Sequence, residues 1–270
     1  QLVIISIPLL GLFLIDDVKS LKPKYRILIQ CFVTIYIIFS TNVYIESLGD
    51  LFGFGDVNLG IFSIPFTVFC VVGIMNAFNM IDGINGLCAG CAMLALLLIG
   101  FYSGLIYDSM LVLIIGSMIG FLIFNLRFFG KKRGVFLGDS GSNLVGFWVA
   151  WSAIYASQNI IYDVQPMTII WFVAIPLLDC VGLIFSRIKK GKSWATAGRD
   201  HIHHKLMKHF SPDGTLLIIL LLVLITGLFG IIIENNSSGP TSLILFLIYG
   251  FIYFFLAHYN NKSNDLENNV

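Results

Sequence analysis

Charge is scarce in this 270-residue chain: only 11% of its residues are Asp, Glu, Lys or Arg, while 57% are hydrophobic. A soluble domain carries roughly a quarter charged residues, so this chain has too little polar surface to cover a water-soluble globule. The net charge is only +1, and no basic patch is interleaved with aromatic residues. The composition therefore excludes a soluble domain, argues against nucleic acid as a partner, and makes lipid the solvent for much of the chain.

Cysteine is scarce as well, and all five cysteines lie inside apolar runs. Buried thiols pack as small hydrophobic side chains, and we favour that interpretation over a redox or zinc pair at Cys88 and Cys91. No cysteine lies in the basic loops, where one would be needed to complete a soft zinc site with the histidines described below.

The first residue is Gln1, and the first apolar run, Leu2 to Ile15, is short. At 1.5 Å per residue this run reaches about 21 Å, less than the roughly 30 Å of a bilayer core. It has neither the basic n-region nor the small-residue cleavage site of a signal peptide. We therefore expect the sequence to be an N-terminally truncated fragment.

What the chain does contain is a series of apolar runs long enough, or nearly so, to cross a bilayer. They fall at residues 2–15, 27–45, 61–79, 87–106, 109–126, 142–157, 166–185, 215–233 and 241–258. No internal repeat and no second soluble domain separates them. The sequence predicts an all-α fold, a polytopic transmembrane helical bundle of about nine helices. It forms one domain over residues 1–258, and a polar tail follows over 259–270.

The loops between these runs differ sharply in charge. All 16 Lys and Arg residues lie after odd-numbered helices, in the first, fifth and seventh loops and in the tail. The even-numbered loops carry only acids, from Glu46 to Glu234. The positive-inside rule makes the odd-numbered loops cytoplasmic. A shifted helix count would scatter the charges over both sides, so the pattern also supports the count.

Four polar segments belong to the odd-numbered loops or to helix ends that lead into them. They are Asp16-Asp17, Asn76 to Gly86, Phe136 to Ser142, and His201 to His204. Convergence of four separate segments on one membrane face is what an active site at the interface requires, whereas a scaffold has no need of it.

In the second segment, polar residues recur every third position at the end of an apolar run, at Asn76, Asn79, Asp82 and Asn85. On a helix this spacing makes one slowly drifting polar stripe, and polar groups at membrane depth mark functional sites by default. Gly83 and Gly86 would end the helix and let the backbone approach a ligand. The alternative is a helix-packing seam with Asn side chains hydrogen-bonded across it.

The third segment reads Gly138-Asp139-Ser140-Gly141-Ser142, directly before an apolar run. A helix N-terminus attracts phosphate, and a carboxylate there can hold a hard cation that bridges phosphate oxygens. The alternative is a plain N-cap made by Asp139 or Ser140.

The first and fourth segments are more ambiguous. Adjacent acids such as Asp16 and Asp17 repel each other unless a cation or hydrogen bonds hold them, and the alternative is a solvated helix end. The histidines of the fourth segment suit a polyanion, since Lys and Arg surround them; zinc binding or simple solvation are the alternatives.

Asp179 is the one ionisable side chain well inside an apolar run. A buried charge needs a partner, and we expect a polar group of the stripe between Asn76 and Asn85 to supply it. Pro176, three residues earlier, should kink the helix.

Together the four segments resemble the polyprenyl-phosphate N-acetylhexosamine-1-phosphate transferases, the glycosyltransferase 4 family that includes WecA, TagO and MraY. The motifs occur in family order from Asp16 to about Lys205, and His201-Ile-His203-His204 looks like the WecA/TagO branch. Members of that branch have about eleven spans, which implies two further helices upstream and a single catalytic domain.

By position, the resemblance implies catalytic roles for Asp16, Asp17, Asp82 and Asp139. It implies Mg²⁺ as cofactor, with Mn²⁺ as an alternative, held by Asp139, Asn79 and Asp82. The implied substrate-binding residues are Asn79, Asn85, Asn125, Phe136, Ser142, His201, His203 and His204. Among these, Asn125 and Phe136 would line the uracil pocket, and the histidines would meet the sugar or the diphosphate. Bacterial members usually carry Asp where this chain has Asn85, which argues against a metal role there.

The implied reaction transfers N-acetylhexosamine-1-phosphate from a UDP-sugar to undecaprenyl phosphate and releases UMP. GlcNAc-1-phosphate is the favoured sugar phosphate. The implied place is the bacterial inner membrane, with the active site facing the cytoplasm. The product would initiate synthesis of an envelope polysaccharide such as O-antigen or teichoic acid. The sequence leaves open the sugar, the pathway and the oligomeric state, a homodimer included.

The main alternative is an ion-coupled membrane transporter. That class predicts ionisable residues near the bilayer midplane and a pseudo-repeat, and the chain offers one such residue and no repeat. An intramembrane aspartyl protease needs Gly-x-Gly-Asp within a span, whereas Gly138-Asp139 follows Phe136-Leu in a basic loop. A CDP-alcohol phosphotransferase would carry Ala-Arg soon after Asp82-Gly83, and this chain does not.

Overall fold

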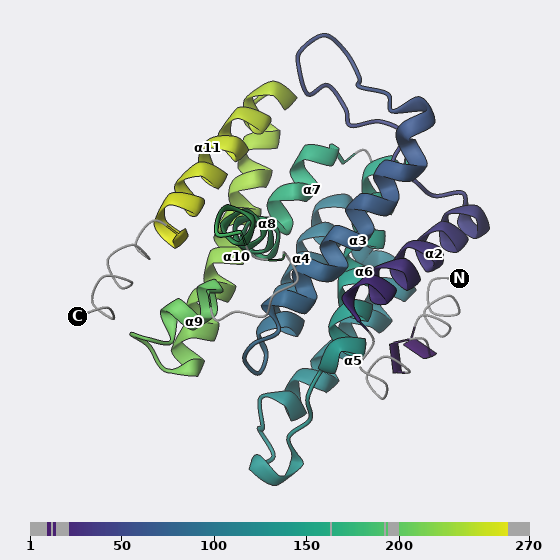
Figure 1. Ribbon diagram of the computed structural model, residues 1–270. Coiled ribbons are helices and arrows are strands. Elements are labelled where there is room, and N and C mark those ends of the chain that lie inside the picture. Colours follow the sequence, from purple (N-terminus) through teal and green to yellow (C-terminus); the bar gives the residue numbers. More distant parts are fainter. Residues whose placement is uncertain are drawn as a thin grey trace.

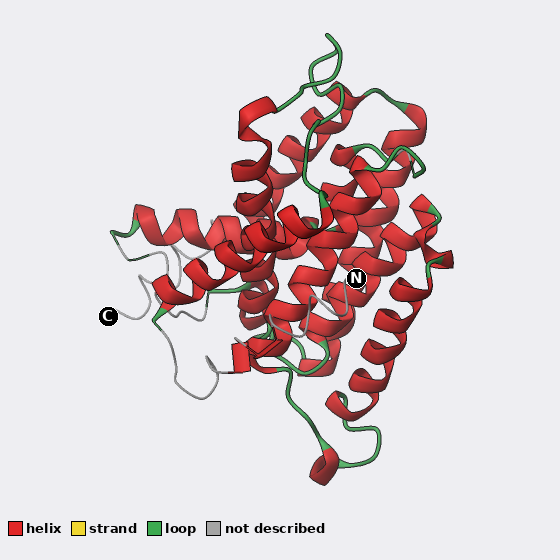
Figure 2. Ribbon diagram, turned by 90° about the vertical axis from the view of Figure 1, so that its right-hand side faces the viewer, coloured by secondary structure: helices red, strands yellow, loops and turns green. Residues whose placement is uncertain are grey.

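The computed structural model describes residues 10–11, 13–14, 22–162, 164–191, 193 and 200–258, and this part of the chain is helical without a strand (Figure 2). The helices are α2 (Pro23–Thr41), α3 (Ser63–Ile81), α4 (Leu87–Ser103), α5 (Ser109–Asn125), α6 (Gly138–Gln158), α7 (Pro166–Phe172), α8 (Ala174–Lys189), α9 (Ile202–Leu206), α10 (Pro212–Asn236) and α11 (Gly239–His258). Short 3-10 turns occur at Gly60–Phe62, Leu105–Tyr107 and Lys131–Arg133. The all-α prediction is confirmed.

The helices also confirm a polytopic membrane protein. Four of those described are long and apolar enough to cross a membrane, at Pro23–Thr41, Gly60–Ile81, Pro212–Asn236 and Gly239–Ala257. The bent pair of α7 and α8 makes a fifth if it is one span, and α4 and α5 are apolar but shorter. Each predicted run after the first coincides with a helix or a helix pair, while the run 2–15 lies largely outside the described residues.

The predicted kink in the seventh run is an 80° bend between α7 and α8. Pro176 lies at the third position of α8, where its missing N–H breaks no bond within that helix. Its ring and its missing N–H instead prevent a continuous helix through Phe172, four residues earlier, which is where α7 ends. The proline therefore acts one turn before its own position.

Loops of the two predicted classes lie at opposite ends of the bundle. The long loop between α2 and α3 is at one end, and the loop between α5 and α6 lies at the other, together with α9 (Figure 1). The first of these loops is even-numbered and the other two segments are odd-numbered in the sequence-based count. The arrangement agrees with the predicted separation of acidic and basic loops.

Helices α3 and α6 pack closely in the middle of the bundle (Figure 1). Gly146 of α6 makes the approach possible, because a Cβ there would lie 2.8 Å from the Met75 Cα and 3.2 Å from the Phe78 Cβ. Met75 and Phe78 are both fully buried. The close contact fixes the end of α3 beside the start of α6.

We expect Gly146→Ala to destabilise the protein by about 1–3 kcal/mol, because the new methyl group meets backbone and α3 must move away. Gly116→Ala in α5 is the matched control, since a Cβ there meets nothing within 4 Å. That control should gain about 0.5–1 kcal/mol from reduced backbone freedom. Thermal unfolding of the purified protein in detergent measures both, and equal midpoints for the two variants would contradict this packing.

Candidate active site

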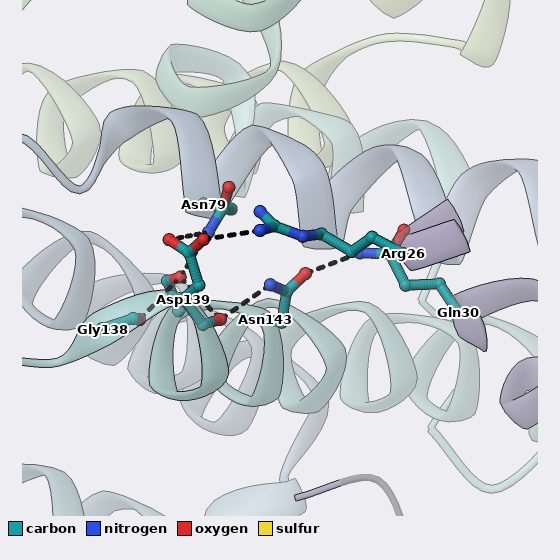
Figure 3. Close-up of polar contacts among 7 residues, drawn as sticks. Arg26, Gln30, Asn79, Gly138, Asp139 and Asn143 are labelled. Carbon is teal, nitrogen blue, oxygen red and sulfur yellow. Dashed lines mark hydrogen bonds and ion pairs between the residues drawn. The ribbon is translucent and has the colours of Figure 1, made fainter. Parts of the chain in front are cut away.

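The end of α3 and the first turn of α6 meet through Asn79. Its side-chain Nδ2 donates a hydrogen bond to the Asp139 Oδ1 at 3.2 Å (Figure 3). The same Nδ2 donates to the Ser142 Oγ at 2.9 Å. The second and third polar segments of the sequence therefore lie in direct contact. Asp139 also lies in the first turn of its helix, where the helix dipole favours a negative charge.

Arg26 reaches the same carboxylate from α2. Its Nη2 lies 2.8 Å from the Asp139 Oδ2, and the two side chains are 21% and 49% exposed (Figure 3). The ion pair is thus open to solvent, and its main consequence is placement: it puts a fixed positive charge at the edge of an acidic site.

A chain of hydrogen-bonded amides continues from this pair into the bundle. The Asn143 Nδ2 donates to the Asp139 carbonyl oxygen at 2.7 Å, and the Gln30 Nε2 donates to the Asn143 Oδ1 at 2.6 Å (Figure 3). The Asn76 Nδ2 in turn donates to the Gln30 Oε1 at 2.8 Å. Gln30 and Asn143 are fully buried, so this satisfied network fixes α2, α3 and α6 relative to one another.

Three members of this arrangement, Arg26, Gln30 and Asn143, are missing from the residues that the sequence singled out. Gln30 and Asn143 carried a usable signal, because each is an amide inside an apolar run, where an unpaired polar group is costly. Arg26 carried none, since it lies among other basic residues in a loop rich in them.

Asp82 follows the last residue of α3 as its C-cap. Burial and, second, the neighbouring Asp139 carboxylate raise the pKa of Asp82 to about 6. A cation beside Asp82 would offset both the cost of burying this carboxylate and the nearby negative charge.

The donor set here fits a hard cation. Asp82 and Asp139 offer carboxylate oxygens, Asn79 an amide oxygen and Ser142 a hydroxyl, which are the ligand types that Mg²⁺ takes. Within the described ranges no three His, Cys, Asp or Glu side chains form a group that could hold a metal. A metal site here therefore has to include amide, hydroxyl, water or substrate oxygens beside the two carboxylates.

The histidine segment joins the same end of the bundle. A Cβ at residue 83 would overlap the His203 imidazole, so that ring lies directly on the Gly83 backbone. Burial, followed by the neighbouring His204 and His201, lowers the pKa of His203 to about 4, so the ring is neutral at neutral pH. The glycine after Asp82 is needed here for close approach, as the sequence suggested, and what approaches is this imidazole.

The expected partner of Asp179 was wrong. Its Oδ2 lies 2.8 Å from the His201 Nδ1, and its Oδ1 accepts the Ile202 N–H at 3.0 Å. Asp179 thus binds the histidine segment and not the stripe between Asn76 and Asn85, because the bend before α8 and the return of the chain at α9 bring these residues together.

The remaining predicted residues lie around this centre. The Asn125 Oδ1 accepts the Gly86 N–H at 2.5 Å and its Nδ2 donates to the Val135 carbonyl at 2.8 Å, so its amide holds the turn after α3 to the loop before α6. Phe136 is 77% exposed in that loop, and Asn85 is half-buried in the turn. Their roles toward uracil or substrate stay predictions. Asp16 and Asp17 lie outside the described residues.

Residues 1–157 match the model of the family described as Glycosyl transferase family 4. The chain is 33% identical over 246 residues to the undecaprenyl-phosphate alpha-N-acetylglucosaminyl 1-phosphate transferase of Escherichia coli K12, covering 88% of this chain and 67% of that relative. The enzyme of the same name from Yersinia pestis is 33% identical over 251 residues, with 88% and 68% covered. The one from Haemophilus influenzae is 33% identical over 208 residues, with 74% and 58% covered.

The amide network generates a test of stability. Gln30→Leu leaves the Asn143 Oδ1 without its donor in a buried place, which should cost about 1–3 kcal/mol. Thr34→Val, one turn later on the same buried face, is the control: the Thr34 hydroxyl only donates to the Gln30 carbonyl within its own helix. Chemical or thermal unfolding should rank Gln30→Leu clearly below Thr34→Val, and the reverse order would refute the network.

Proposed function

The chain belongs to glycosyl transferase family 4, and from that premise we propose that it transfers GlcNAc-1-phosphate from UDP-GlcNAc to undecaprenyl phosphate. The relatives named above carry this lipid and this sugar phosphate in their names. The observation that carries the proposal is the contact between Asn79 and Asp139 beside Asp82, with His203 on the adjoining Gly83. The names of the relatives give no support to the transporter alternative.

The proposed reaction is a direct displacement. An oxygen of the polyprenyl phosphate forms a bond to the β-phosphorus of the UDP-sugar, and the bond from that phosphorus to the oxygen bridging the α-phosphate breaks. UMP leaves with the bond electrons, and the lipid-linked diphospho-sugar forms. A phosphate monoester is already an anion near neutral pH, so it needs little help from a base and no covalent enzyme intermediate.

Both reactants are anions, so their repulsion has to be reduced before they meet. Arg26 places a positive charge at the site, which lowers the electrostatic cost of bringing a second phosphate to the first. His203, neutral at neutral pH, adds hydrogen-bonding capacity without charge. The turn at Asp82 and Gly83 lies between these groups.

We assign the cation to Mg²⁺, with Asp139, Asp82 and Asn79 as its protein ligands. When bound, the ion would offset negative charge on the diphosphate and on the departing UMP. The raised pKa of Asp82 supports this assignment, because a carboxylate that is buried next to a second acid is stabilised in its charged form by a divalent cation.

The apolar helices place the substrates in different phases. The isoprenoid tail can stay in lipid while its phosphate reaches the polar end of the bundle. The positive-inside rule assigns that end to the cytoplasm, where nucleotide sugars are soluble. We therefore propose the cytoplasmic membrane of a bacterium as the location, with the active site on the inner face.

Membranes containing the protein should convert labelled UDP-GlcNAc and undecaprenyl phosphate into a labelled lipid that extracts into organic solvent. Asp139→Asn should abolish this transfer, because it removes the charge from the central carboxylate. Asp213→Asn removes an exposed acid from the first turn of α10 and should transfer at the normal rate. Near-normal turnover by Asp139→Asn would discard the site, and a panel of UDP-sugars in the same assay identifies the sugar.

Metal removal is a separate test. Treatment with EDTA should stop transfer by the unaltered protein, because the diphosphate and the two carboxylates then lack their cation. Added Mg²⁺ should restore the rate in full, and Asn79→Ala should raise the Mg²⁺ concentration needed for half-maximal rate. Transfer that persists in excess EDTA contradicts the metal assignment without touching the proposed reaction.

A further inference from the structure

Asp179 is the centre of a buried contact among three helices. It is 1% exposed in α8, and besides His201 and Ile202 its carboxylate accepts the Tyr253 hydroxyl of α11 at 3.4 Å. Tyr253 and His201 are themselves 8% and 7% exposed. The carboxylate thus links the histidine segment to a helix that begins more than thirty residues later in the chain.

These bonds determine where α9 begins. His201 is the N-cap residue of this five-residue helix, and its own side chain makes no capping hydrogen bond. The Asp179 Oδ1 instead accepts the N–H of Ile202, the first residue of α9, which has no partner within the helix. A helix this short is unstable alone, so its position depends on such contacts from neighbouring elements. Lys205 adds another, since its ammonium donates to the Ala257 carbonyl of α11.

The contact with Asp179 also determines which ring nitrogen of His201 carries a hydrogen. Its Nδ1 faces a carboxylate oxygen, so this nitrogen carries the proton and donates it. The His201 ring in turn stacks on the His203 ring, with 5.3 Å between centroids and 16° between planes. A displacement of His201 is therefore transmitted directly to His203.

His203 is a buried imidazole whose hydrogen-bonding capacity is unused among the described residues. The side chain is 1% exposed, and neither ring nitrogen has a hydrogen-bond partner. A buried polar atom left unpaired is costly, so its persistence calls for an explanation such as a ligand. The ring lies on Gly83, next to Asp82, which is where the proposed function puts the diphosphate.

We propose that Asp179, supported by Tyr253, is a positioning residue that holds α9 so that the His203 nitrogens face the donor nucleotide sugar at the turn Asp82-Gly83. The carboxylate does not touch substrate; it acts through His201 and the first amide of α9. This inference rests on the proposed function for the identity of the ligand, whereas the role of Asp179 in holding α9 rests on the contacts alone.

Two variants weaken the contacts of Asp179 to different extents. Asp179→Asn keeps the shape but removes the charge and forces its amide against the His201 Nδ1, while Tyr253→Phe removes a single hydroxyl. The matched control is Tyr249→Phe, one turn earlier on α11, whose ring packs against Trp171 and whose hydroxyl makes no hydrogen bond to Asp179. Thermal unfolding curves should show that all three variants are folded at the assay temperature.

The first readout is independent of catalysis. Diethyl pyrocarbonate modifies accessible imidazole nitrogens, and peptide mass spectrometry gives the rate at each histidine. We expect His203 to react about tenfold faster or more in Asp179→Asn and about 2- to 10-fold faster in Tyr253→Phe, with no change in Tyr249→Phe. Asp139→Asn should also leave His203 protected, which separates loss of turnover from loosening of α9. Unchanged protection in Asp179→Asn overturns the proposal, whatever the protein's activity.

The second readout compares the kinetic constants for UDP-GlcNAc with those for undecaprenyl phosphate in the lipid-transfer assay. Asp179→Asn should lose about 10- to 100-fold in kcat/KM for UDP-GlcNAc, the size of effect found when the hydrogen-bond partner that orients a metal-ligating histidine is removed. Its KM for undecaprenyl phosphate should not change. A KM for undecaprenyl phosphate that rises by the same factor as kcat/KM for UDP-GlcNAc falls would overturn the positioning role. So would an unchanged kcat/KM for UDP-GlcNAc. Absence of transfer by the unaltered protein would refute the proposed function instead.

Discussion

The end of α3 is held from two sides, and the candidate active site depends on that constraint. On one side Asn79 donates to Asp139, 60 positions later in the sequence; on the other, His203 lies on the Gly83 backbone. Gly146 permits the first contact by letting α6 approach α3, and Gly83 permits the second. Between them lies Asp82, whose pKa is raised to about 6 by burial and by Asp139. The buried amides of Gln30 and Asn143 are paired, whereas the two ring nitrogens of His203 have no hydrogen-bond partner among the described residues.

The sequence predicts most of the fold because lipid-facing helices have to be apolar along their length. The predicted and observed elements differ mainly where a helix has a polar first turn. Helix α2 begins at Pro23 and not at residue 27, since Pro is favoured at the first helical position and Lys24 and Arg26 interrupt the apolar run. Helix α6 begins at Gly138 and not at residue 142, with Asp139 in its first turn. Apolar length alone does not detect such turns, and they carry part of the site.

Sequence reasoning locates the site more readily than it pairs the residues. The polar segments were predicted to share one end of the bundle, and the structure brings Asn79, Asp139 and His203 there. Spacing along a helix shows which residues share a face, but it carries no information about contacts between helices. The pairing of Asp179 with His201, and of Arg26 with Asp139, arises from such contacts. Both depend on the bend before α8 and on the entry of α2, which motifs do not encode.

Cysteine cross-linking between the turn after α3 and the histidine segment tests the convergence most directly. In a Gly83→Cys/His203→Cys variant, a short thiol-to-thiol cross-linker should produce a cross-linked peptide that joins residues 83 and 203, because the far end of the His203 imidazole reaches the glycine backbone. The pair Gly83→Cys/Lys208→Cys, with its second cysteine at an exposed position beyond α9, should not cross-link. Cross-linking of the second pair and not of the first would contradict a site in which the segments of Asp82, Asp139 and His203 meet.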